Sequence, residues 1–116
     1  MKLEDQVCSL NLAKRLNEIG VRQESAFYWI LCPLDAVWGV EFWEFSMPGP
    51  IGGYSAFTVA ELGGMLPIGC MSTKIFDDLP WACVLDVPAF RFDGKTEADA
   101  RAKMLINLIE KGIVTL

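Results

Sequence analysis

Carboxylates are the side chains whose spacing comes closest to a catalytic arrangement in this sequence. The candidate pairs are Glu41 with Glu44, Asp77 with Asp78, and Asp86 set against the strand that carries Glu41. General acid–base catalysis needs two carboxyl groups that are held apart in a cleft and have different pKa values. The competing interpretation places the glutamates on a solvent-facing strand, the paired aspartates in a turn and Asp86 on an outward face. Because charged residues mostly mark solvated surface, this interpretation is favoured and no catalytic residue is assigned.

Histidine is absent from the 116 residues. Its absence excludes nucleophiles activated by histidine, histidine acid–base catalysis and nearly every familiar catalytic zinc site. An enzyme would have to use carboxylates, lysine, tyrosine or cysteine, and the sequence predicts neither a metal site nor a cofactor. The cysteines show no C-x-x-C spacing, so we interpret them as core residues or inert thiols rather than a disulfide or zinc framework. They are Cys8, Cys32, Cys70 and Cys83.

The middle of the chain is a Pro- and Gly-rich segment that begins at Ser46. Its Gly49-Pro-Ile-Gly-Gly53 run lacks both the glycine spacing of dinucleotide-binding loops and the Lys-Ser/Thr of phosphate loops, so it is interpreted as a connection. Apolar and aromatic residues on such a loop can nevertheless contact a partner protein. Tryptophans usually fill the core, but two of the four in this chain are expected to be exposed. The predicted partner-binding residues are therefore Met47, Ile51, Tyr54, Phe57, Trp38 and Trp43.

The composition also favours a binding protein. Apolar residues make up 53% of the chain, against about 45–50% in ordinary globular domains. The excess predicts apolar surface left over for a protein partner or for self-association as a homodimer. A net charge of −5 argues against nucleic acid as a partner, although its sign fits acidic mimicry of nucleic acid. The chain has no 18-residue apolar run and starts with an acidic segment, so we expect a soluble cytoplasmic protein that does not enter the membrane.

Helix signals mark three segments of the chain. Ser9 is a candidate N-cap for a helix with the apolar stripe of Leu12, Ala13, Leu16 and Ile19, and Gly20 is placed to end it. Whether residues 3–8 add a further turn or form a separate helix is left open. Thr58 and Glu61 form a capping box that predicts a short helix from Val59 to before Pro67. Thr96, followed by acidic residues, begins the longest helix, whose wide apolar face predicts deep burial, and Gly112 ends it.

Strand signals lie between these helices. The aromatic run 26–31 predicts a strand that is covered on both faces, and 40–45 predicts a more exposed partner in an antiparallel hairpin. The segment 82–87 predicts a third strand, and Phe90–Phe92 extends it or forms a fourth. Residues 68–80 give no clear pattern, although Lys74-Ile-Phe allows a short strand. These elements predict an α+β fold in one domain over residues 1–116, an antiparallel sheet of three to four strands packed by N- and C-terminal helices with a short central helix.

Three stretches together resemble small uncharacterised proteins that are encoded in bacteriophages and prophages of gut bacteria. They are Val7-Cys-Ser-Leu to Ser25, Phe57-Thr-Val-Ala-Glu-Leu to Pro67, and Thr96-Glu-Ala-Asp-Ala-Arg to Ile106. The layout is similar to phage α-β-α sandwich domains. The shared motifs are helix caps and core faces, and they carry no catalytic signature. The resemblance implies a phage origin and a location in the bacterial host cytoplasm, but it implies no activity.

The favoured hypothesis is therefore a phage-type accessory protein that acts by protein–protein interaction without catalysis. The alternative is a small carboxylate-based enzyme or small-ligand binder with a site near the central loop. A cleft beside Glu41, Glu44 or Asp86 would favour the alternative. An exposed apolar surface would favour the binding protein.

Overall fold

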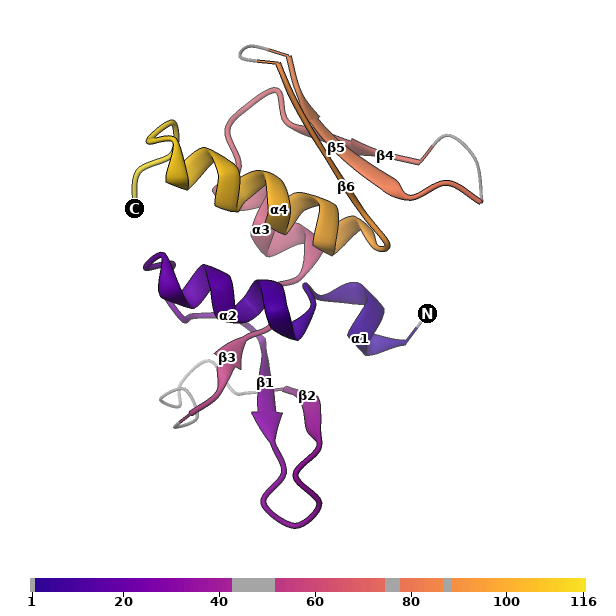
Figure 1. The fold of residues 1–116 in the computed structure, drawn as a ribbon, viewed down its shortest axis with the longest axis vertical. Helices are drawn as coiled ribbons and strands as arrows, with labels where there is room; N and C mark the ends of the chain where they lie inside the picture. The colour runs from indigo at the N-terminus through magenta and orange to yellow at the C-terminus, as the bar shows by residue number, and fades with distance from the viewer. Residues whose placement is uncertain (1, 43–51, 75–77, 87–88) are drawn as a thin grey trace.

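The fold places a layer of helices between two antiparallel sheets (Figure 1). The computed structural model describes residues 2–42, 52–74, 78–86 and 89–116. One sheet has the strand order β2-β1-β3 and the other the order β4-β5-β6. In chain order the elements are α1 (Leu3–Gln6), α2 (Leu10–Glu18), β1 (Phe27–Leu31), β2 (Trp38–Phe42), β3 (Tyr54–Ser55), α3 (Val59–Met65), β4 (Met71–Thr73), β5 (Trp81–Leu85), β6 (Phe90–Gly94) and α4 (Glu97–Glu110).

The predicted α+β class is confirmed, but the strands form two sheets instead of one. β1 pairs with β2 and β3, and β5 pairs with β4 and β6, so each half of the chain builds its own sheet. The short strands β3 and β4, which the sequence did not predict, complete the two sheets. The helices separate β1 from β5 and prevent them from joining (Figure 1).

α2 and α4 run side by side in the same direction between the sheets. At their N-terminal ends the Ser9 backbone N–H donates to the Asp99 carboxylate at 2.7 Å. At their C-terminal ends Arg15 forms an ion pair with Glu110 at 2.6 Å. Ser9 occupies the predicted N-cap of α2, although its side chain makes no cap hydrogen bond. Gly20 follows α2 with a φ of 95°, the left-handed conformation that glycine adopts without steric cost.

α4 is buried on two sides, which explains its wide apolar face. One face contacts α2 and α3 through Ala98, Ala102 and Leu105. The other face contacts the sheet that contains β5 through Ala100, Met104 and Leu108. The helix therefore belongs to both halves of the hydrophobic core. None of the described helices is long and apolar enough to cross a bilayer.

α3 begins with the predicted capping box. The Thr58 hydroxyl accepts the Glu61 N–H at 3.2 Å, and the Glu61 carboxylate accepts the Thr58 N–H at 2.9 Å. The same carboxylate also accepts the Ala26 N–H at 3.1 Å, which ties α3 to the start of β1. Glu61 therefore caps α3 and also connects this helix to β1.

Thr58→Ala is expected to lower the free energy of unfolding by about 1 kcal/mol, because it leaves the Glu61 N–H without its acceptor. Urea denaturation would measure the loss. Thr58→Ser keeps a hydroxyl at the same place and is expected to retain most of the stability. Equal stabilities of the alanine and serine variants would contradict this role for the hydroxyl.

Candidate functional site

The β1–β2 hairpin extends away from the helices at one end of the molecule (Figure 1). The strands pair antiparallel from Phe27 with Phe42 to Leu31 with Trp38, as the sequence predicts for a hairpin. The end of the hairpin, residues 31–37, is called the hairpin tip below. Its residues are drawn from an apolar segment, Leu31-Cys-Pro-Leu-Asp-Ala-Val37, instead of the polar residues common in turns.

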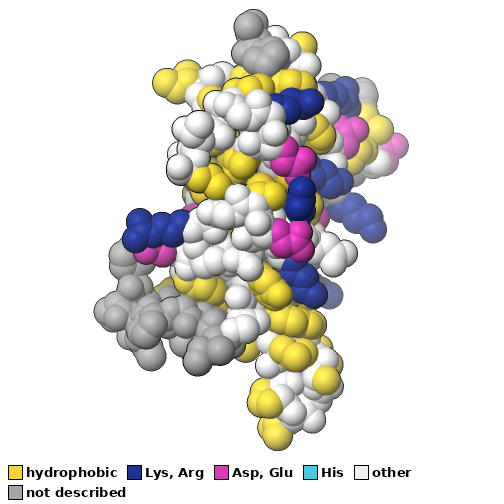
Figure 2. Space-filling model, turned by 60° about the vertical axis from the view of Figure 1, so that its left-hand side comes forward, with side chains coloured by type: hydrophobic (Ala, Val, Ile, Leu, Met, Phe, Trp, Pro, Cys, Tyr) yellow, Lys and Arg dark blue, Asp and Glu magenta, His cyan; other side chains and the backbone are white. Residues whose placement is uncertain are grey.

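The hairpin tip exposes large apolar side chains. Leu34 is 95% exposed, Val37 60% and Leu31 44%. Figure 2 shows hydrophobic side chains over the lower, protruding end of the molecule. Single exposed leucines are common, but a group of them on a protrusion indicates a contact surface.

Internal hydrogen bonds hold the hairpin tip in one conformation. Cys32 donates its N–H to the carbonyl oxygen of Val37 at 3.0 Å and accepts the N–H of Ala36 at 2.9 Å. Ala36 has a φ of 55°, a conformation that costs a non-glycine residue about 1–2 kcal/mol. The Asp35 carboxylate accepts the Val37 N–H at 3.1 Å, and this bond, with a weaker one from Cys32, lowers the pKa of Asp35. The apolar side chains of the tip are therefore presented on an ordered turn.

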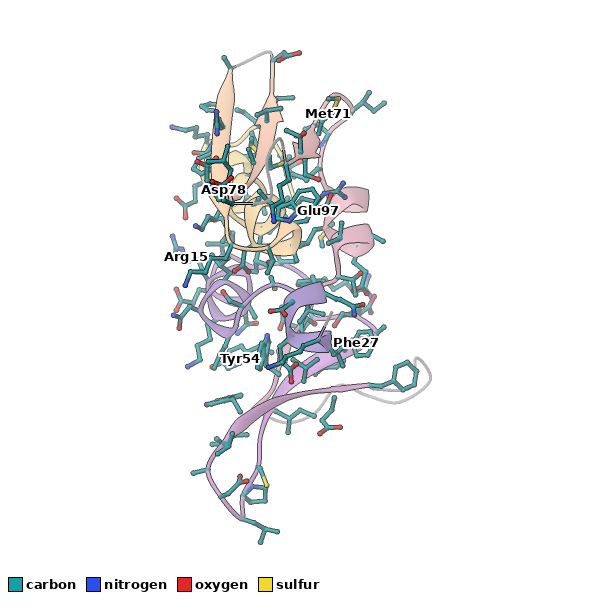
Figure 3. All side chains as sticks on the ribbon, turned by 90° about the vertical axis from the view of Figure 1, so that its right-hand side faces the viewer. Arg15, Phe27, Tyr54, Met71, Asp78 and Glu97 are labelled. Atoms are coloured by element: carbon teal, nitrogen blue, oxygen red, sulfur yellow. The ribbon has the colours of Figure 1, made fainter. Side chains whose placement is uncertain are left out.

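The base of the hairpin packs against α2 through aromatic rings. Trp38 and Tyr54 lie 5.8 Å apart between ring centroids, and the Lys14 ammonium lies over both rings at 5.3 and 5.8 Å. Phe27 and Phe42 make an edge-to-face contact, also at 5.8 Å. Figure 3 shows Tyr54 where the strands meet α2. The Lys14 ammonium over Trp38 and Tyr54 connects the hairpin base to α2, whereas the Phe27–Phe42 contact joins the two hairpin strands to each other.

The predicted partner-binding residues differ in where the structure places them. Trp38 and Tyr54 are half-buried at the hairpin base. Phe57 is 1% exposed and lies in the core, so the expectation that it contributes to a surface is corrected. Met47, Ile51 and Trp43 lie outside the described residues, as do Glu44 and most of the central loop. The sequence analysis missed Leu34 and Val37, although apolar residues continuing through a turn were the signal that could have found them.

A cleft of about 530 Å³ lies between α1 and the first turns of α3 and α4. Trp81 forms part of the wall of the cleft. Lys74, which follows β4, and Lys95, in the turn before α4, also line it. The Thr58 and Thr96 hydroxyls in its lining already accept helix N–H groups. The cleft has room for a small ligand, but these two hydroxyls are committed to the fold.

Glu97, also in the lining of this cleft, belongs to a structural network. Its carboxylate accepts the Ser72 hydroxyl and pairs with Arg101 at 3.4 Å, and Arg101 in turn donates to the Val59 carbonyl oxygen at 2.9 Å. Figure 3 shows Glu97 between α4 and α3. Gly63 leaves room for this arginine, because a Cβ there would lie 2.4 Å from its Nη1. Glu97 therefore ties α4 to β4 and, through Arg101, to α3, and it is not a free base.

Among the candidate catalytic carboxylates, Glu44 and Asp77 lie outside the described residues, and the described Glu41 and Asp86 do not converge. Glu41 is exposed on β2, and Asp86 is exposed after β5, in the sheets on opposite sides of the helices. Neither residue lines the cleft of 530 Å³. Within the described residues, no three acidic or cysteine side chains come close enough to hold a metal ion.

The four cysteines are free thiols, and two are fully buried. Burial raises the pKa of Cys8 to about 12 and that of Cys83 to about 11. Burial also raises the pKa of Cys70, which lies near Cys83. Because the thiolate is the reactive form, these groups are poor nucleophiles at neutral pH.

Neither a protein-family model, nor a curated protein, nor a solved structure matches this chain significantly.

Proposed function

We propose that this chain is a binding protein without catalytic activity, which contacts another protein through the hairpin tip. The observation that carries this proposal is the exposure of Leu31, Leu34 and Val37 on an ordered protrusion. Solvating these side chains is unfavourable, and burying them in an apolar groove of a partner would recover about 25 cal/mol for each Å² covered. The ordered turn also limits the entropy lost on binding.

The alternative, a carboxylate-based enzyme or a small-ligand binder, has weaker support. Glu41 and Asp86 are separated, and Glu97 forms an ion pair with Arg101. Nucleic acid is not proposed as a partner because the net charge is −5. The resemblance of the helix and core segments to phage proteins supports a phage-encoded accessory protein that acts in the bacterial cytoplasm.

Leu34→Asp is expected to weaken binding to the partner by roughly 30-fold, because it places a charge in the apolar contact. The experiment compares the proteins captured from a bacterial lysate by the wild type and by the variant, followed by titration of the captured protein. Ile68→Asp is the matched control, because Ile68 is a fully exposed apolar residue in another part of the fold. Equal capture and affinity for Leu34→Asp and wild type would overturn the proposal.

A further inference from the structure

The strand order β2-β1-β3 leaves the outer edge of β2 without a neighbouring strand among the described residues, although α1 contacts β2. The edge strands β3 and β4 have only two and three residues. The edge strand β6 carries the charged Arg91 and Asp93, and the Lys103 ammonium donates to the Asp93 carbonyl oxygen at 2.8 Å. β2 has five residues with one charged side chain, Glu41, and with neither proline nor lysine, and such an edge is a template for pairing with another chain.

The register shows which backbone groups of β2 face the open edge. The hydrogen bond from Cys32 N–H to the Val37 carbonyl oxygen shows that Val37 is bonded toward the β1 side of the hairpin. Successive residues of an antiparallel strand direct their polar groups to opposite sides, so Gly39 and Glu41 also face β1. The N–H and C=O groups that face the open edge are those of Trp38, Val40 and Phe42.

We propose that β2 pairs antiparallel with β2 of a second copy of this chain, with the two-fold axis at Val40. In this register Val40 lies opposite Val40 of the other copy, and Trp38 lies opposite Phe42. All three pairs are of the hydrogen-bonded kind, so the two edges exchange about six backbone hydrogen bonds, two for each pair. The β2-β1-β3 sheets of the two copies become one six-stranded sheet that is continuous across the dimer.

The side chains fit the same register. Trp38, Val40 and Phe42 share one face of β2, because residues two apart point the same way. Phe42 is 65% exposed, and the pairing places it against Trp38 of the second copy. Cross-strand aromatic pairs of this kind stabilise sheets.

The charges of β2 select this register over its neighbour. Pairing centred on Val40 places Glu41 opposite Gly39, and a Cβ built on Gly39 meets no atom within 4 Å, so the glutamate has space. A register centred on Glu41 would place the two glutamates directly opposite each other, which is unfavourable. The register centred on Val40 therefore avoids the repulsion between glutamates that the register centred on Glu41 would create.

This inference goes beyond the proposed function and uses different residues. Self-pairing requires the edge of β2, whereas partner binding requires the hairpin tip. Leu34→Asp is therefore expected to weaken partner binding while leaving self-pairing intact. The failure of one proposal can be recognised without the failure of the other.

The test is the mass of the full chain in solution, measured by sedimentation equilibrium over a range of concentrations. The wild type is expected to reach twice its chain mass of 12.9 kDa. Val40→Pro is expected to stay monomeric and folded, because the N–H that it removes faces the open edge and not β1. Val40→Thr keeps the N–H and the branched side chain, and it is expected to dimerise as the wild type does. Phe42→Lys, which changes no backbone group, is expected to weaken the dimer by at least about tenfold.

Amide hydrogen exchange supplies a second readout at the level of single residues. The amides of Trp38, Val40 and Phe42 are expected to be protected at high concentration and to exchange rapidly on dilution. Those of Gly39 and Glu41, which bond to β1, are expected to be protected at both concentrations. The proposal is overturned by a wild type that stays monomeric up to about 1 mM. A dimer with unprotected edge amides, or a folded Val40→Pro variant that still dimerises, also overturns it. If Val40→Pro does not fold, the mass of Phe42→Lys decides.

Discussion

Phe57→Ala is expected to lower the free energy of unfolding by about 3–5 kcal/mol, the largest loss that we predict for a single side chain. Phe57 is 1% exposed and belongs to the core cluster shared by α2, α3 and α4, so the truncation leaves a cavity bounded by three helices. Domains of this size have a total stability of only about 5–15 kcal/mol. Chemical denaturation followed by tryptophan fluorescence would measure the loss.

Two further variants make this result specific. Phe57→Leu retains most of the apolar volume and is expected to lose much less stability than the alanine variant. Ile68→Ala truncates an apolar side chain that is fully exposed, and its effect is expected to stay within about 0.5 kcal/mol. A Phe57→Ala protein as stable as the Ile68→Ala protein would show that Phe57 is not a core residue.

Gly94→Ala is expected to cost about 3 kcal/mol for a different reason, which is overpacking. Gly94 ends β6 where the strand meets the first turns of α4. A Cβ at this position would lie 2.5 Å from the Ala100 backbone nitrogen and 2.9 Å from Asp99. These atoms belong to the backbone and base of a buried helix and cannot move aside as the end of a flexible side chain can. Thermal and urea denaturation would both detect the loss.

Gly64→Ala is the matched control for Gly94. A Cβ at Gly64 meets no atom within 4 Å, and the residue is exposed in α3. Alanine in such a helix position is expected to raise the stability by about 0.5–1 kcal/mol. The two substitutions add the same methyl group. If the free energy of unfolding falls in Gly94→Ala and rises in Gly64→Ala, the difference must come from close packing at Gly94 and not from the backbone preference of alanine. A neutral Gly94→Ala would contradict the close approach of β6 to α4.

The sequence predicted the features of this fold that depend on neighbours along the chain. The capping box of Thr58 and Glu61, the cap at Thr96 and the glycine that ends α2 all follow from residues within four positions of each other. Two strands were missed because their signal is too short. β3 has two residues and β4 has three, so neither shows an alternating pattern, and both exist because a longer strand beside them supplies hydrogen bonds.

The division into two sheets could not be read from the sequence, because a strand pattern does not specify the partner strand.

The burial of Phe57, in contrast, had a local signal in the sequence. Phe57 precedes the N-cap Thr58, and Leu62 is the fourth helical residue, which is the spacing of a hydrophobic staple. Both side chains are buried in the same cluster. The hairpin tip was missed because leucine and valine do not indicate a turn by themselves, and only the apolar residues that continue through the turn marked it.

The parallel pair of α2 and α4 has a consequence for the order of folding. Each sheet is built from strands that follow one another closely in the chain, whereas the Ser9–Asp99 bond joins residues 90 positions apart. Contacts between distant residues form late, because closing a long loop costs entropy before any contact is gained. All six described strands precede α4 in the chain, so the apolar faces that α4 covers stay open until α4 has been synthesised. The nascent chain is therefore expected to be most vulnerable to aggregation just before α4 emerges.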